Sequence, residues 1–227
     1  MNYLYFLINL CTIIVPFIFS YHPKINFHKH FKAFFIANFL IASIFISWDY
    51  IFTDLGIWGF NPKYISGFHL LNLPIEEILF FICIPFSCVF TYHAINKFKN
   101  FKRNEHFEKI FSLVLSLVLI VLSCCFLDKK YTFYCFLSSG ILIFSFVFLF
   151  KINWFTKILY VYPILIIPFL IVNGILTGTG IEQEVVWYNN KEIIGFRILT
   201  IPIEDFVYGF ELIIANLFFY ERFRQTK

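Results

Sequence analysis

The chain has 227 residues, of which 60% are hydrophobic and 14% charged, and its mean hydropathy is +0.79. This composition excludes an ordinary soluble domain and indicates a protein with several membrane-spanning helices. The formal net charge of +4 is gathered in short segments between apolar stretches, a pattern typical of membrane topology and anionic lipid rather than of nucleic-acid binding.

Seven apolar segments approach the roughly 20 residues that a helix needs to cross a bilayer. In chain order they are residues 3–20, 33–48, 73–95, 110–127, 131–150, 158–176 and 201–220. The second is short and is expected to tilt or to extend into its neighbours. The first has neither a basic N-terminal region nor a small-residue cleavage site, so we expect a retained helix. Strands of a membrane barrel would show about ten residues of alternating polarity, so the predicted fold is all-α.

Two stretches are copies of each other at an offset of 128 residues. Residues 61–77 read NPKYISGFHLLNLPIEE and residues 189–205 read NNKEIIGFRILTIPIED, with nine of seventeen positions identical and no gap. The offset maps the first three helices onto the last three and leaves the fourth as a linker. We therefore predict two parallel three-helix repeats in a 3+1+3 layout, with a pseudo-two-fold axis along the membrane normal. The units are residues 1–96, a linker at 97–130, and residues 131–227.

Basic residues predict the orientation. Thirteen of the eighteen Lys and Arg residues lie in segments 21–32, 97–109, 151–157 and the tail after residue 220. The positive-inside bias then places these segments in the cytoplasm, with the N-terminus outside and the C-terminus inside a cell (inner) membrane. Both copies of the repeated motif are expected at the outer ends of their helices.

The repeated motif ends in carboxylates at Glu76, Glu77, Glu204 and Asp205, and Glu211 follows Glu204 on the same helical face. A charge near lipid costs several kcal/mol unless it is paired, neutralised or hydrated. Acids at a helix start can complement the helix dipole, but this does not account for two adjacent acids in each copy. Carboxyl groups that share a dry site can divide into an acid and a base, so we expect these five residues to be catalytic. The sequence leaves open which is the acid and which is the base.

Long loops at 49–72 and 177–200 precede the two motifs and are expected to fold back over the helix ends. Within them, Asn72 and Thr200 are expected to cap the helices, with Pro74 and Pro202 in the first turn. The residues expected to bind substrate or to support the carboxylates are Asp49, Trp58, Asn61, His69, Asn72, Asn173, Trp187, Thr200 and Tyr208.

Motifs for cofactors are missing from the sequence. No Gly-x-Gly-x-x-Gly follows a strand, the four aspartates form no Asp-rich pair for Mg-diphosphate, and the six cysteines lie in apolar segments without Cys-x-x-Cys spacing. We therefore expect neither a cofactor nor a metal, and inert, buried thiols.

The duplicated Pro-x-Glu-(Glu/Asp), at Pro74–Glu77 and Pro202–Asp205, resembles the hallmark of the membrane-bound lycopene cyclases of carotenoid synthesis. Nearly the whole chain resembles the form in which two homologous subunits are fused, although Asn190 and Glu192 replace the Pro62 and Tyr64 of the first loop. The resemblance implies a redox-neutral cyclisation. An acid protonates the terminal double bond of an acyclic carotene end, the neighbouring double bond attacks the cation, and loss of a ring proton leaves a β-ionone ring. The implied partners are a polyene such as lycopene and membrane lipid, with a homo-oligomer left open.

Two other functions remain open at this stage. Small sugar transporters also have a 3+1+3 parallel-repeat layout, and a membrane assembly protein would need no catalysis. A transporter needs polar groups at the bilayer midplane, whereas here they gather at the outer helix ends.

Because no dinucleotide or metal motif is present, we predict that the reaction needs no added flavin, nicotinamide or metal. Conversion of lycopene by washed membranes, with and without reduced flavin, NADPH or a chelator, measures this. A strict dependence on reduced flavin would contradict the prediction.

Overall fold

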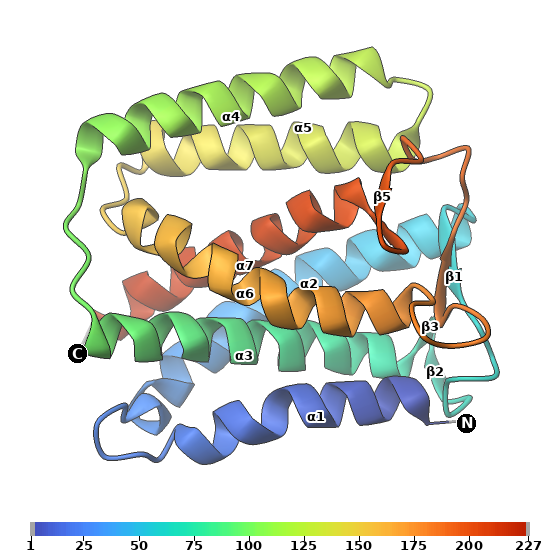
Figure 1. Cartoon of the computed structure of the whole chain (residues 1–227), viewed down its shortest axis with the longest axis horizontal. Helices are drawn as coiled ribbons and strands as arrows, with labels where there is room; N and C mark the ends of the chain where they lie inside the picture. The colour runs from blue at the N-terminus through green and yellow to red at the C-terminus, as the bar shows by residue number, and fades with distance from the viewer. Residues whose placement is uncertain (1–2, 226–227) are drawn as a thin grey trace.

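The computed structural model describes residues 3–225, in which seven long helices run lengthwise through the molecule (Figure 1). In chain order these are α1 (Leu4–Phe19), α2 (Phe31–Asp54), α3 (Ile75–Phe98), α4 (Glu105–Cys125), α5 (Lys130–Phe144), α6 (Phe155–Leu176) and α7 (Ile203–Arg224). A 3-10 turn at Phe27–His30 precedes α2, and a π-helical turn at Ser145–Leu149 continues α5. Each apolar segment of the sequence overlaps one of these helices, so the all-helical fold is confirmed.

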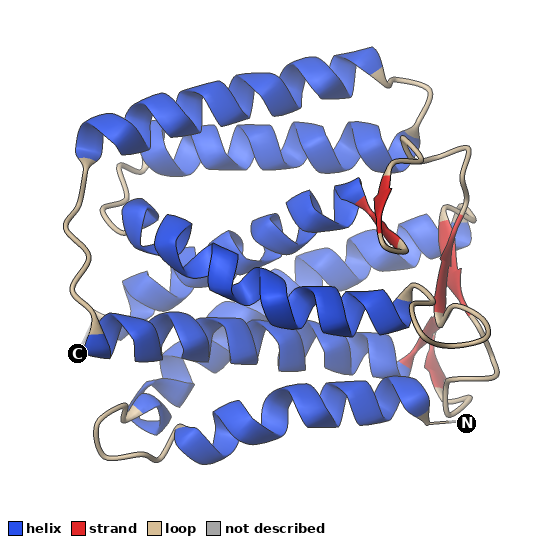
Figure 2. Cartoon of the chain, in the orientation of Figure 1, coloured by secondary structure: helices blue, strands red, loops and turns tan. Residues whose placement is uncertain are grey.

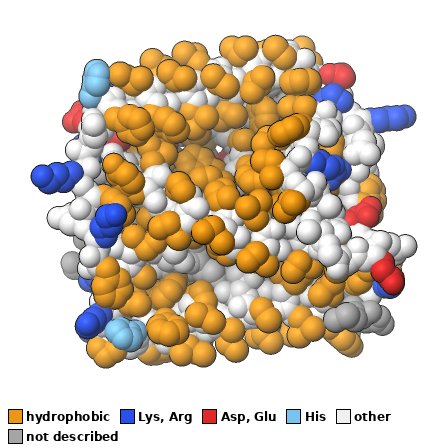
Figure 3. All heavy atoms as spheres, in the orientation of Figure 1, with side chains coloured by type: hydrophobic (Ala, Val, Ile, Leu, Met, Phe, Trp, Pro, Cys, Tyr) orange, Lys and Arg blue, Asp and Glu red, His pale blue; other side chains and the backbone are white. Residues whose placement is uncertain are grey.

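Within the described residues, five helices are long and apolar enough to cross a membrane. They are α2 with its preceding turn, α3, α4, α5 with its π turn, and α6. The 16 residues of α1 span about 24 Å at 1.5 Å per residue, against a hydrocarbon core of about 30 Å. Helix α7 is long enough but carries several acids and arginines. Figure 3 shows apolar side chains over the middle of the molecule and most charged side chains near its two ends. Seven crossings stay a prediction.

Helix α2 is longer than its apolar segment. The expected stretch at 33–48 becomes a 24-residue helix, Phe31–Asp54. Its last turns carry polar residues that lower the hydropathy, but Asp49 and Phe52 are buried against the protein. Hydropathy therefore missed a part of the helix that faces neighbouring helices.

Helices of the two halves exchange neighbours. Helix α2 packs mainly on α7 and α6 packs on α3, while α1 lies against α3, and α5 against α7 and α4. Burial of apolar area contributes little free energy to helix association inside lipid, so close packing of side chains and the geometry of ring contacts stabilise these interfaces. One example is Phe34 of α2 against Phe86 of α3, with ring centroids 5.2 Å apart and planes at 89°.

Six short strands gather at one end of the molecule, the end that also holds the start of α1 (Figure 2). They are β1 (Trp58–Phe60), β2 (His69–Leu70), β3 (Leu73–Pro74), β4 (Val186–Tyr188), β5 (Arg197–Ile198) and β6 (Ile201–Pro202). Strands β2 and β3 form one hairpin and β5 and β6 form its counterpart, each leading into a motif helix. The C-terminus lies at the opposite end (Figure 1).

Strands β1 and β4 join the two loops across a local two-fold relation. Gly59 pairs with Trp187, which occupies the matching position of the second repeat. On either side, the backbone N–H of Asn61 donates to Val185 O and the backbone N–H of Asn189 donates to Ile57 O, both at 2.8 Å. A Cβ at Gly59 would collide with the Trp187 indole, so glycine is required for this close approach.

The helix caps differ from expectation. Pro74 and Pro202 are themselves the N-cap residues, and neither α3 nor α7 has a side-chain cap. The side-chain amide of Asn72 donates to Tyr50 O at 3.1 Å, and Thr200 Oγ1 donates to Gly174 O at 3.2 Å. The hairpins that precede α3 and α7 direct both side chains toward the preceding helices, so the expected Asn72 and Thr200 caps are wrong.

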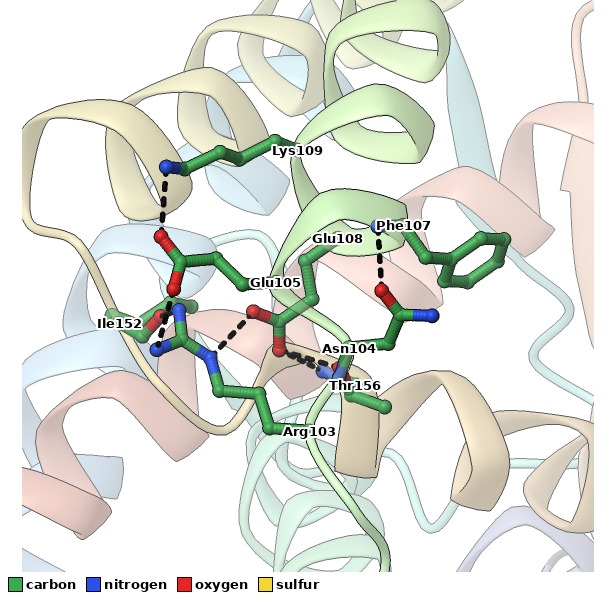
Figure 4. A network of polar contacts seen from close by, with 8 residues as sticks. All are labelled: Arg103, Asn104, Glu105, Phe107, Glu108, Lys109, Ile152 and Thr156. Carbon is green, nitrogen blue, oxygen red and sulfur yellow. Dashed lines mark hydrogen bonds and ion pairs between the residues drawn. The ribbon is translucent and has the colours of Figure 1, made fainter.

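At the C-terminal end of the molecule, a buried carboxylate fastens α4 to the start of α6 (Figure 4). Glu108 Oε1 accepts hydrogen bonds from the Thr156 amide at 2.7 Å and the Thr156 hydroxyl at 2.6 Å, and Arg103 Nε donates to its other oxygen at 2.7 Å. An anion at a helix N-terminus is stabilised by the helix dipole and by unpaired N–H groups. Helix α4 is therefore held to α6 by directed polar contacts.

The two ends of the molecule allow a direct test of orientation. On a background without native cysteines, we predict that Asn190→Cys, in the motif loops, reacts with an impermeant maleimide added to intact cells. Asn100→Cys, at the opposite and more basic end, should react only after permeabilisation. The reverse labelling pattern would show the opposite orientation in the membrane, with the motif carboxylates on the cytoplasmic side.

Candidate active site

A cavity of about 450 Å³ lies between α1, α3, α6 and α7 and is closed at one end by the paired loops. Its wall is mostly apolar and aromatic, and it follows α3 from Glu77 to Thr91. The fourteen residue-to-residue steps from Glu77 to Thr91 correspond to about 21 Å, so the cavity is long and runs along the helix axes. Three carboxylates line it: Asp49, Glu77 and Asp205.

Glu77, the second acid of the first motif, receives one hydrogen bond. The Tyr5 hydroxyl of α1 donates to Glu77 Oε2 at 2.6 Å. Both side chains are buried and both line the cavity. Glu77 is close enough to interact electrostatically with Asp205 across the cavity.

Asp205, the matching acid of the second motif, is surrounded by donors. Its Oδ1 accepts from the Tyr131 hydroxyl at 2.8 Å, and its Oδ2 accepts from the Tyr188 hydroxyl at 2.9 Å and the Asn173 amide at 3.1 Å. Tyr188 belongs to β4 in the loop, where burial first and the neighbouring Asp205 second raise the pKa of its phenol. The phenol therefore keeps its proton and acts as a donor. Three donors to an ionised carboxylate offset much of its desolvation cost.

Asp49 is the third cavity acid and comes from α2, outside the repeated motif. Its side chain is 4% exposed, and the Trp58 indole interacts with its carboxylate. Its Oδ2 atom is buried without a hydrogen-bond partner.

The first acids of the two motifs point away from the cavity and into the loops. Glu76 Oε1 accepts from the Ser66 amide at 2.8 Å, and Glu204 Oε1 accepts from the Ile194 amide at 2.7 Å. These are matching positions of the two repeats. Consecutive residues of a helix project about 100° apart, so Glu76 and Glu77 face different surroundings.

Glu211 also lies outside the cavity wall. The hydroxyls of Ser138 and Ser139 on α5 donate to Glu211 Oε2 at 2.9 and 2.7 Å. Its counterpart in α3 is Cys83, so this contact between α5 and α7 has no equivalent in the first half.

The structure brings only some of the expected supporting residues to the cavity. Asp49, Trp58, Asn173 and Tyr208 line it, and the Tyr208 hydroxyl is buried there without a partner. The other five lie in the loops: Asn61, His69, Asn72, Trp187 and Thr200. Of these, the exposed His69 bonds to its own loop at Gly67 O, and Asn61 joins the two loops through Glu184 O.

The tyrosines that hold the motif acids were not among the site residues expected from the sequence. Tyr5 and Tyr131 serve Glu77 and Asp205 in the same way, yet they are 126 residues apart rather than 128. Four residues later in each helix, Asn9 and Cys135 contact Glu76 O and Glu204 O. A comparison of the two halves that allowed a two-residue shift would have found both pairs.

The family model described as lycopene cyclase matches residues 2–95 and 128–223, most of the chain. No curated protein and no solved structure matches the chain.

The second-motif glutamate gives a stability test. Glu204 Oε1 accepts from the Thr132 hydroxyl at 2.6 Å and from Ile194 N. We predict that Glu204→Ala loses about 1–3 kcal/mol of stability, because the buried Thr132 hydroxyl and the part-buried Ile194 amide lose their acceptor. Glu204→Gln keeps an acceptor oxygen and should lose much less. Thermal unfolding in detergent and proteolysis of loop 177–200 measure both variants; equal stability of Ala and Gln variants would refute the anchoring contact.

Proposed function

The chain belongs to the lycopene cyclase family, and on that premise we propose that it converts the acyclic end of a carotene such as lycopene into a β-ionone ring by acid–base catalysis. The single observation that carries the proposal is the cavity with Asp49, Glu77 and Asp205 at its loop-covered end. A long apolar space suits a polyene, and carboxyl groups at one end of it suit proton transfer to and from the end group.

The proposed reaction is an isomerisation in which protons and electrons balance. A carboxylic acid gives its proton to the terminal double bond and leaves a tertiary cation. The neighbouring double bond attacks that cation, forming the ring C–C bond and moving the positive charge into the ring. A carboxylate then removes a ring proton and restores a double bond. No redox equivalent is consumed, and a proton returns from the base to the acid.

The hydrogen bonds support one assignment of roles, in which Glu77 is the acid and Asp205 is the base. Asp205 accepts from Tyr131, Tyr188 and Asn173, which favours the ionised form. Glu77 accepts from Tyr5 alone and is the less stabilised anion. Catalytic roles for Glu76, Glu204 and Glu211 stay predictions. Their hydrogen bonds to the loops and to α5 also support a role in holding those segments in place.

Aromatic side chains suit the cation. Trp58, Tyr131, Tyr188 and Tyr208 line the cavity at the acid end. Ring faces attract cations, and an apolar wall keeps water from trapping the intermediate as an alcohol.

We also propose the 3+1+3 arrangement, with units 1–96, 97–130 and 131–227, in a cell membrane with the N-terminus outside. Matched hydrogen bonds support the duplication: Tyr5 N to Tyr64 O at 3.2 Å in the first half, and Tyr131 N to Glu192 O at 3.1 Å in the second.

Expression in cells that accumulate lycopene tests the function. We predict a change from red to yellow-orange and ring-containing products by chromatography. Glu77→Gln and Asp205→Asn should each lower conversion by about 100-fold or more at equal membrane abundance, within the usual contribution of general acid–base catalysis. Glu182→Gln is the matched control, because this exposed acid lies in the same loop layer, pairs with Lys63 and does not line the cavity. Unchanged lycopene with the abundant wild-type protein would contradict the proposal.

A further inference from the structure

The cavity carboxylates form an unusually charged group for a buried site. Asp49 and Glu77 interact electrostatically, and Glu77 also interacts with Asp205. None of the ion pairs of residues 3–225 includes any of the three, and the cation that interacts electrostatically with the group is Arg197, which acts on Asp205. Like charges that line one mostly apolar cavity oppose full ionisation, so at least one proton is retained among them.

The donors show where that proton lies. Each oxygen of Asp205 accepts a hydrogen bond. Among residues 3–225, no donor bonds to Asp49 Oδ2, and Tyr5 is the donor to Glu77. A buried carboxyl oxygen without a donor is more stable when it carries or shares a proton, and Glu77 lines the same cavity as Asp49 and interacts with it electrostatically.

The first half of the chain holds this second acid, and the second half does not. The position that matches Asp49 is Thr177, whose hydroxyl donates to Asn173 O at 2.7 Å and also bonds to Thr200. One turn before Thr177, the Asn173 side-chain amide donates to Asp205. The residue that matches Asn173 in α2 is Phe45, which has no polar group to offer. The two halves of the acid group are therefore chemically unequal: α2 adds the second acid Asp49 to Glu77, whereas α6 adds the donor Asn173 to Asp205.

We infer that Asp49 and Glu77 share one proton and act together as the acid of the site, a role that rests on the proposed cyclisation. When this proton passes to the terminal carbon–carbon double bond, both carboxylates become anionic beside the new cation. Their combined charge then stabilises the cation more than a single carboxylate would. Asp205 accepts the ring proton, and its return to the Asp49–Glu77 pair completes the cycle without any other reactant.

Asp49→Asn tests the inference, because the amide keeps the volume and cannot share an acidic proton. Asp54→Asn is the matched control: it removes an exposed acid from the last turn of the same helix. Lycopene conversion by membranes gives kcat and KM at equal protein abundance. We expect Asp49→Asn to lower kcat by about 100-fold with KM within about threefold, Asp49→Glu to recover part of it, and Asp54→Asn to match the wild type.

A double variant distinguishes joint action from a structural role. If Asp49 and Glu77 form one acid, Asp49→Asn combined with Glu77→Gln is no slower than the slower single variant. If Asp49→Asn fails to reach the membrane, Asp49→Ser, with a smaller side chain, takes its place in the same cycle. Wild-type kcat in Asp49→Asn, or losses that multiply in the double variant, would overturn the inference while active wild-type protein still supports the cyclase. Inactive wild-type protein would instead refute the proposed function.

Discussion

Burial of carboxylates away from water is the constraint on which this structure depends. Each motif acid needs a donor, and the donors come from other segments of the chain: Tyr5 from α1, Tyr131 from α5, and backbone amides at Ser66 and Ile194 from the loops. Every such bond therefore also fixes a helix or a loop. The groups that we propose for chemistry and the groups that hold the fold are parts of one hydrogen-bonded system.

The exchange of neighbours between the halves makes one site out of two repeats. Helix α6 packs on α3 and α2 packs on α7, so each motif helix is covered by a helix of the other half. The β1–β4 pairing closes the same end with one strand from each loop. Glu77 and Asp205 consequently line a single cavity, and neither half encloses that space alone.

The helices, the duplication and the carboxylates were predictable from the sequence, because apolar runs and a gap-free repeat are local signals. The different roles of Glu76 and Glu77 were not, since side-chain direction within the first turn depends on where the helix begins. Tyr5 and Tyr131 carried no signal at the offset of 128, because the register of α1 and α5 differs by two residues from that of the motif helices. Asp49 was expected near the motif. The lack of a hydrogen-bond partner at its Oδ2 could not be predicted, because it depends on how Trp58 and Glu77 pack around it in the folded chain.

The contacts of the linker helix bear on how the two halves remain together. Helix α4 packs mainly on α5, and Glu108 ties it to Thr156 at the start of α6 in the second half. The chain passes from α3 to α4, and so from one half to the other, through the short stretch 99–104, which has no helix or strand. This stretch raises the effective concentration of one half near the other, whereas the interface is built by helices and loops on either side of it. A polypeptide divided there would keep the helix and loop contacts described above and would lose mainly proximity, so assembly of the site would then depend on concentration.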